Sequence, residues 1–88
     1  ADGGSYPVAE LRMSSYKNNR LCYIPEHVIV RNVESVLNDA AEKNNADADT
    51  YFRERISYAL GVLKQYALAL DDVRASGAAS LEVFKNGM

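Results

Sequence analysis

The chain has 88 residues, of which 48% are apolar and 25% are charged, and its formal net charge is −2. A chain of this length forms one domain, and this composition is that of an ordinary globular protein rather than a disordered one. A near-neutral chain lacks the basic footprint of a nucleic-acid binder, and no apolar run reaches the roughly 18 residues that would span a bilayer.

The first five residues, ADGGS, are polar and glycine-rich, which predicts a flexible N-terminus at residues 1–5. A start at Ala1 in place of Met is typical of a chain from which a signal or transit peptide has been removed, and the alternative is a trimmed fragment. With Cys22 as its single cysteine, the chain has no intrachain disulfide. This favours an intracellular protein, or one in a compartment where it docks on something larger.

Two helices are predicted in the first half of the chain. The first runs from about Pro7 to Lys17, because proline suits the first helical position and apolar residues follow at helical spacing. Residues 20–24 then form an apolar connector. Pro25 opens a second, longer helix that extends to about Lys43, on apolar residues spaced three or four apart: Ile29, Val33, Val36, Leu37, Ala40 and Ala41.

The most regular pattern is that of residues 49–74, which predicts a long helix capped by Asp47, Asp49 or Thr50 and stopped by Gly77. Its apolar arc covers roughly 200°, so the helix has to be covered from two directions. Leu63 lies at the centre of this arc and is predicted to be buried in the core. The central row is Phe52, Ile56, Ala59, Leu60, Leu63, Tyr66, Ala67 and Leu70, and the row beside it is Tyr51, Tyr58, Val62, Ala69 and Val73.

A short fourth helix is predicted over residues 78–85. Because the two long helices are joined by a short loop, they are expected to be antiparallel. The predicted fold is therefore all-α, an up-down-up-down four-helix bundle in which two long central helices lie between shorter terminal ones. It forms a single domain over residues 1–88.

The residues that could carry out chemistry are few. Cys22 and His27 are the only nucleophile and base pair, but no motif positions a third group to orient the histidine, so a structural role is favoured. The run Asn45-x-Asp47-x-Asp49 begins like a calcium loop but lacks the glycine and the glutamate that such a loop requires, so turn and capping roles are favoured. We therefore predict no catalytic site, no cofactor, no metal site and no enzymatic activity.

One stretch near the N-terminus combines cationic and aromatic side chains, which are favoured at protein interfaces. The alternative is a tyrosine-rich outer layer without a partner. The predicted partner-binding residues are Tyr6, Arg12, Tyr16, Lys17, Arg20 and Tyr23.

The helix plan of residues 7–85, together with the ADGG start, resembles in outline the small extrinsic subunits of photosystem II, of the Q type and its diatom relative. The resemblance implies an accessory subunit that docks on photosystem II membrane subunits in the thylakoid lumen and supports oxygen evolution. The alternative is a soluble helical interaction domain, such as a secreted effector, an immunity protein or a small cytoplasmic adaptor. In both cases we expect a protein partner, no nucleic acid, and at most a peripheral position on a membrane.

Overall fold

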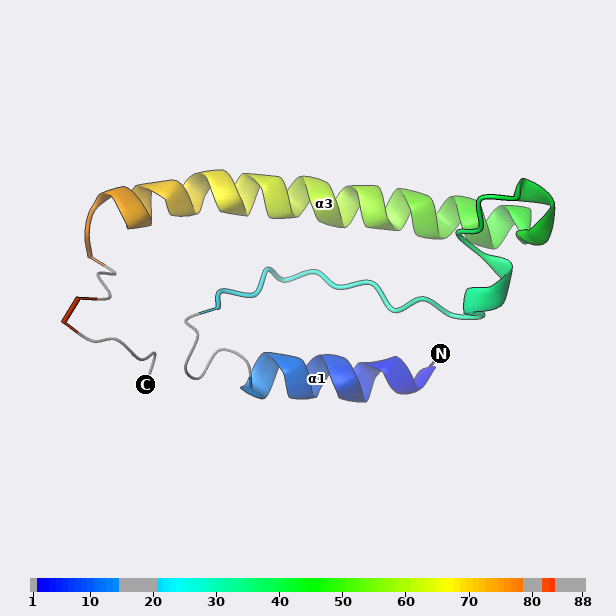
Figure 1. The fold of residues 1–88 in the computed structure, drawn as a ribbon, viewed down its shortest axis with the longest axis horizontal. Helices are drawn as coiled ribbons and strands as arrows, with labels where there is room; N and C mark the ends of the chain where they lie inside the picture. Colours follow the sequence, from blue (N-terminus) through cyan, green and yellow to red (C-terminus); the bar gives the residue numbers. More distant parts are fainter. Residues whose placement is uncertain (1, 15–20, 79–81, 84–88) are drawn as a thin grey trace.

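The computed structural model describes residues 2–14, 21–78 and 82–83. This part of the chain contains two α-helices, α1 (Ser5–Ser14) and α3 (Ala46–Ala75), and the short 3₁₀ helices Asp2–Gly4, Val33–Ser35 and Ala41–Lys43. Helical residues make up 67% of the described chain and none of it is strand, which confirms the all-α class. In Figure 1, α1 and α3 run in the same direction, and a stretched-out segment, residues 21–32, runs back between them. We call residues 21–32 the return segment.

The predicted four-helix bundle is wrong, because the described chain has only two α-helices. The long helix predicted over residues 25–43 is absent: the return segment is irregular, and residues 33–45 form turns and two 3₁₀ helices. Two local features work against a helix there. The β-branched run of residues 28–30 lowers helix propensity, and Asn32 has a left-handed φ of 50°, which a right-handed helix cannot contain. The predicted fourth helix lies mostly outside the described residues.

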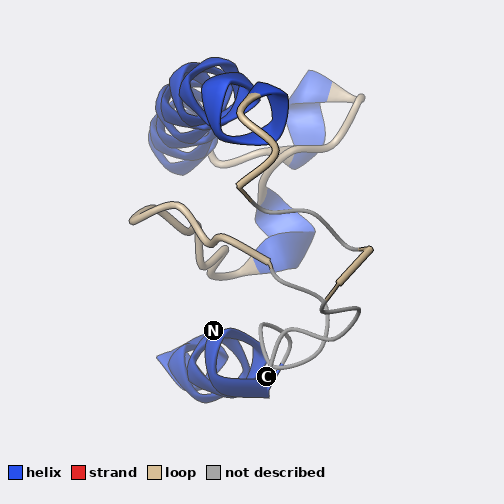
Figure 2. Cartoon of the chain, turned by 90° about the vertical axis from the view of Figure 1, so that its left-hand side faces the viewer, coloured by secondary structure: helices blue, strands red, loops and turns tan. Residues whose placement is uncertain are grey.

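Two arginines hold the return segment between the helices. Arg12 of α1 donates from Nη2 to the carbonyl oxygens of Ile24, at 3.0 Å, and Glu26, at 3.3 Å. Arg55 of α3 forms an ion pair with the Glu26 side chain and donates to the carbonyl of His27 at 3.3 Å. These backbone carbonyls are thus satisfied by side chains in place of helical N–H groups. Figure 2 shows the resulting tiers, with α3 and α1 on opposite sides of the return segment.

The turn region between the return segment and α3 is held by side-chain hydrogen bonds. Asn44 Oδ1 accepts from the backbone and the side chain of Asn38, both at 2.9 Å, and Asn44 Nδ2 donates to the Asn38 carbonyl at 3.1 Å. Leu37 has a left-handed φ of 61°, and its N–H donates to Asp49 Oδ1 at 2.6 Å. Val36, beside it, is only 2% exposed. The hydrogen bond and the burial offset the strain of a non-glycine residue in this conformation.

The N-terminal helix begins at Ser5, two residues earlier than predicted, and is preceded by the 3₁₀ turn of residues 2–4. Gly4 lies directly against Ile29 of the return segment. A Cβ atom on Gly4 would come within 2.8 Å of Ile29 Cγ2, whereas one on Gly3 would meet nothing within 4 Å. The absence of a side chain at Gly4 therefore permits the close approach of the N-terminal turn and the return segment.

The long helix α3 has 30 residues and begins three residues earlier than predicted. Its N-cap is Asn45, whose Oδ1 accepts from the N–H of Ala48 at 3.1 Å, so none of the three predicted capping residues is the cap. At the other end, Gly77 has a φ of 73°, the left-handed conformation typical of the residue that ends a helix. This confirms the predicted stop.

The core is small. Among the described residues, Val36 and Phe52 are the buried apolar side chains. Leu63, predicted to lie at the centre of the core, is 47% exposed, and the second long helix expected to cover it, over residues 25–43, is not formed. The radius of gyration is 17.3 Å, whereas a compact chain of this length has one of about 12 Å. The chain by itself leaves much apolar surface uncovered.

Candidate functional site

The apolar arc of α3 is covered at one end and open at the other. The return segment runs alongside α3 from near its start to past its middle (Figure 1), and in the N-terminal half of the helix Phe52 is 8% exposed and Ile56 and Ala59 are half-buried. Farther along the helix, Leu63 is 47% exposed and Tyr66 is 41% exposed. The same helical face thus changes from covered to solvent-facing within about two turns.

We call the open part of this face the uncovered stripe and define it as Leu63, Tyr66, Leu70 and Val73. These residues recur at intervals of three, four and three, so they lie on one line along the helix. Leu70 is half-buried and the other three are exposed. Apart from the Tyr66 hydroxyl the stripe carries no polar side-chain atom, so it is suited to apolar packing rather than to binding a charged or polar ligand. Further exposed apolar side chains flank it at Leu60, Ala67 and Ala69.

A shallow groove lies beside the stripe, on the side of Tyr58. It runs over Gly61, where the missing side chain lowers the helix surface, and its lining is almost entirely apolar. The groove reaches Tyr66, so it joins the uncovered stripe in one continuous apolar surface. Its lining residues are Ser57, Tyr58, Gly61, Val62, Gln65 and Tyr66.

The predicted N-terminal patch is only partly within the described chain, since Tyr16, Lys17 and Arg20 lie outside it. Tyr6 is 81% exposed. Arg12 and Tyr23 lie together: the guanidinium is 5.3 Å from the centroid of the Tyr23 ring, and the Tyr23 hydroxyl donates to the Leu11 carbonyl at 3.2 Å.

Because Arg12 also bonds the return segment, its side chain has a structural role. A role for the patch in partner binding stays a prediction.

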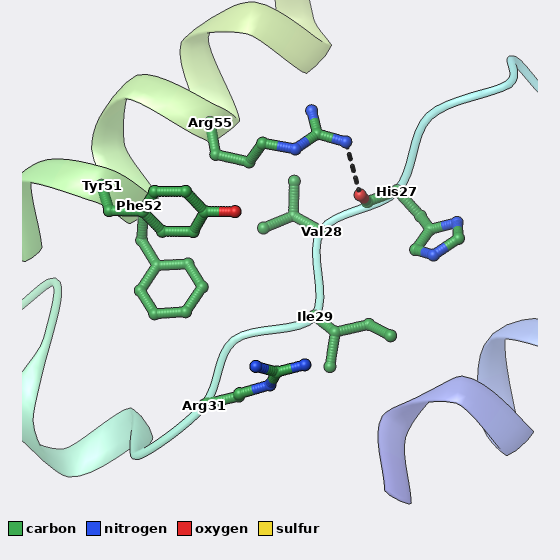
Figure 3. A pocket seen from close by; sticks show the side chains of 7 residues that line it. All are labelled: His27, Val28, Ile29, Arg31, Tyr51, Phe52 and Arg55. Carbon is green, nitrogen blue, oxygen red and sulfur yellow. Dashed lines mark hydrogen bonds between the residues drawn. The ribbon is translucent and has the colours of Figure 1, made fainter. Parts of the chain in front are cut away.

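A polar pocket of about 210 Å³ lies between α3 and the return segment. Figure 3 shows the side chains of Tyr51, Phe52 and Arg55 on the α3 side of it and Val28 pointing toward them from the return segment, whereas the Ile29 side chain points the other way. Arg55 Nη1 is buried, and no hydrogen-bond partner for it is present. Arg55 is paired with Glu26, and Arg31 also lines the pocket.

The candidate nucleophile and base, Cys22 and His27, both lie in the return segment. Cys22 is an exposed free thiol. His27 is also exposed, and its Nδ1 lies 3.5 Å from Arg12 Nη2. His27 thus contacts both arginines that hold the return segment, Arg12 through its ring and Arg55 through its carbonyl oxygen.

Asp49 is the described carboxyl group whose environment is most clearly altered. The hydrogen bond from the Leu37 N–H lowers the pKa of Asp49 below its ordinary value of 3.8. A second hydrogen bond, from Arg53 Nε at 2.8 Å, acts in the same direction, and partial desolvation opposes both. The carboxylate therefore ties α3 to the turn region in its charged form.

Within residues 2–14, 21–78 and 82–83, no three His, Cys, Asp or Glu side chains gather in a way that could hold a metal ion. No helix in the same part of the chain is both long and apolar enough to cross a membrane. Comparison with protein-family models, with curated proteins and with solved structures finds no match for this chain.

Sequence reasoning identified the residues of the uncovered stripe but assigned them to the interior. Their helical spacing shows only that they share a face. Whether that face meets the same chain or another one depends on what packs against it, and local spacing carries no information on this. The pocket around Arg55 was also missed, because its partners lie 28 or 29 residues away in the sequence.

Proposed function

We propose that this protein works by protein–protein association, as a non-enzymatic helical docking module whose contact surface is the uncovered stripe of α3. The observation that carries the proposal is the exposure of three large apolar side chains in one line, Leu63, Tyr66 and Val73. Contiguous exposed apolar surface of this kind marks interaction sites on soluble proteins, because its exposure to water is unfavourable.

The proposal assigns no catalytic role to the polar pocket. Arg55 and Glu26 are paired with each other, and Arg55 also bonds the return segment, so these groups are engaged in holding the fold. Tyr51 and Phe52 contribute packing surface, with their rings in an edge-to-face arrangement at a centroid distance of 5.3 Å.

The proposal covers both an accessory subunit of a larger assembly and a soluble interaction domain. The resemblance to the extrinsic photosystem II subunits included a four-helix plan, whereas the described residues contain two α-helices, so the helix plan does not favour the first of these. A location in the thylakoid lumen stays a prediction. Detection of the protein in a lumenal fraction, released by salt washing of the membranes, would test it.

Photo-crosslinking tests the docking surface directly. We would introduce p-benzoylphenylalanine at Tyr66 on the stripe and, as a matched control, at Lys64, which lies on the opposite face about 160° away. Both proteins are irradiated in an extract of the natural source. We expect one saturable adduct from position 66 and none from position 64.

If the captured chain is another protein, the adduct should disappear when excess unlabelled parent chain is added and should persist when the competitor is the Leu63→Glu variant. If the captured chain is a second copy, the adduct should keep the mass of two chains when parent is added. Equal adducts from both positions, or no adduct from position 66, would refute the assignment of the surface. The mass of the adduct also shows whether the captured chain is another protein or a second copy of this one.

A further inference from the structure

We infer that the uncovered stripe of α3 packs against the same stripe of a second copy of this chain, so that the protein is a homodimer held by antiparallel α3 helices. The inference rests on the proposed function, since it names the partner for the docking surface already described. Three properties of the chain carry it: the spacing of the stripe, the amount of surface left open, and the fit of the stripe to itself.

The spacing is that of a helix–helix seam. From Phe52 to Val73 the apolar residues alternate in steps of four and three without a break, which is the heptad pattern by which one helix packs along another. Phe52 and Ile56 at the start of this seam are covered by the chain itself. The seam continues for about two further heptads, over which nothing in the described chain replaces the missing helix. The full series is Phe52, Ile56, Ala59, Leu63, Tyr66, Leu70 and Val73.

The open surface is larger than a dimer needs. The accessible surface of the chain is 7180 Å², whereas a compact monomer of 9.7 kDa exposes about 5,100 Å². This surplus of roughly 2,000 Å², summed over the whole chain, exceeds the ~800 Å² that each partner contributes to a standard interface. In a two-fold symmetric dimer both chains have the same surplus, and one contact reduces it in both.

The stripe also fits itself when the helices are antiparallel. With the two-fold axis at the level of residue 68, Leu63 lies opposite Val73 of the second copy and Tyr66 lies opposite its Leu70. The exposed alanines Ala67 and Ala69 flank the stripe at that level, and their small side chains let the two helices approach closely. The overlap covers residues 61–75, beyond the part of α3 that contacts the return segment near Arg55.

The charges favour the antiparallel arrangement and do not enter the seam. Lys64, Asp71 and Asp72 lie on the outer side of the helix, and Asp71 is paired with Arg74 of its own chain. In a parallel dimer the two Asp71-Asp72 pairs would lie side by side and the helix dipoles would be aligned. The antiparallel arrangement separates like charges and opposes the dipoles.

Sedimentation analysis and light scattering over micromolar to millimolar concentrations test this inference. We expect the parent mass to rise from 9.7 kDa to twice that value, and Leu63→Glu to stay at the monomer mass. Lys64→Glu, on the outer face, should associate like the parent. A second stripe variant, Val73→Glu in the last turn of α3, should also be monomeric, and circular dichroism should show that each variant keeps the parent's helix content.

A disulfide experiment tests the geometry. In a Cys22→Ser background, Ala67→Cys should form a covalent dimer on mild oxidation, because residue 67 lies close to residue 67 of the second copy near the two-fold axis. Lys64→Cys, on the outer face, should not form one.

A parent that stays monomeric throughout, or a dimer that Leu63→Glu leaves intact, overturns the inference. If the parent is monomeric but the crosslinker at position 66 captures a different protein, the docking function stands and only the identity of the partner is wrong. If position 66 captures nothing, both proposals fail.

Discussion

Replacement of Phe52 by alanine should destabilise this protein more than any other single truncation on α3. The ring is 8% exposed and packs edge-to-face on Tyr51. Loss of a buried phenyl ring costs about 3–5 kcal/mol. A chain of 88 residues has a total stability of roughly 4–13 kcal/mol, and one with so small a core belongs at the low end. Phe52→Ala is therefore expected to be largely unfolded, and Phe52→Leu, at a cost of about 1–2 kcal/mol, is the variant to measure.

The matched control is Leu63→Ala, a truncation on the same face of the same helix. Since Leu63 is 47% exposed, its removal leaves no closed cavity and should cost about 1 kcal/mol or less in dilute protein. Urea unfolding, followed by far-ultraviolet circular dichroism at low concentration, gives both values. An equal or larger shift of the midpoint for Leu63→Ala would refute the account of which part of α3 is covered. At high concentration the Leu63 effect should grow, because dimerisation buries that side chain.

Two further predictions concern the contacts at the ends of the fold. Gly4→Ala should lower the free energy of unfolding, because the added Cβ collides with Ile29. Gly3→Ala, the control, should be neutral or slightly stabilising. A denaturant midpoint unchanged by Gly4→Ala would show that the N-terminal turn does not pack against Ile29. The pKa of Asp49 is lower in the folded chain than its ordinary value of 3.8, so its stabilising effect is full above about pH 4 and is lost as the pH falls through that value towards the folded pKa. Asp49→Asn should therefore be less stable than the parent at neutral pH and should lose less stability on acidification, and parallel pH profiles of the two proteins would contradict this.

The helix α3 is the part of the structure that could be predicted from sequence alone. Its apolar residues keep the helical period over about six turns, and Gly77 ends it through a conformation that glycine adopts without strain. These are local properties, since each depends on residues within a few positions of one another. The N-cap was missed by a few residues because Asn45 and the nearby acids are all competent capping side chains.

Residues 25–43 show where local reasoning fails. Their apolar residues also recur at helical spacing, yet the chain there is irregular, because groups distant in sequence compete for its backbone. Arg12 and Arg55 bond the carbonyls of residues 24–27, and Asp49 bonds the N–H of Leu37 in its left-handed conformation. A β-branched segment with weak helix propensity is readily drawn into such contacts.

The candidate site depends both on the local sequence pattern and on the tertiary structure. The sequence by itself determined that Leu63, Tyr66, Leu70 and Val73 share one face of a helix, because side-chain direction follows from the helical period. Only the tertiary structure decided that this face is open to solvent, because burial depends on which segments return to pack against it. Residues 25–43 form most of the return segment and of the turn region in place of a second long helix. They therefore cover Phe52 and leave the stripe exposed. A core predicted from periodicity thus became a surface, and that change is the physical basis for the interaction proposed for this protein.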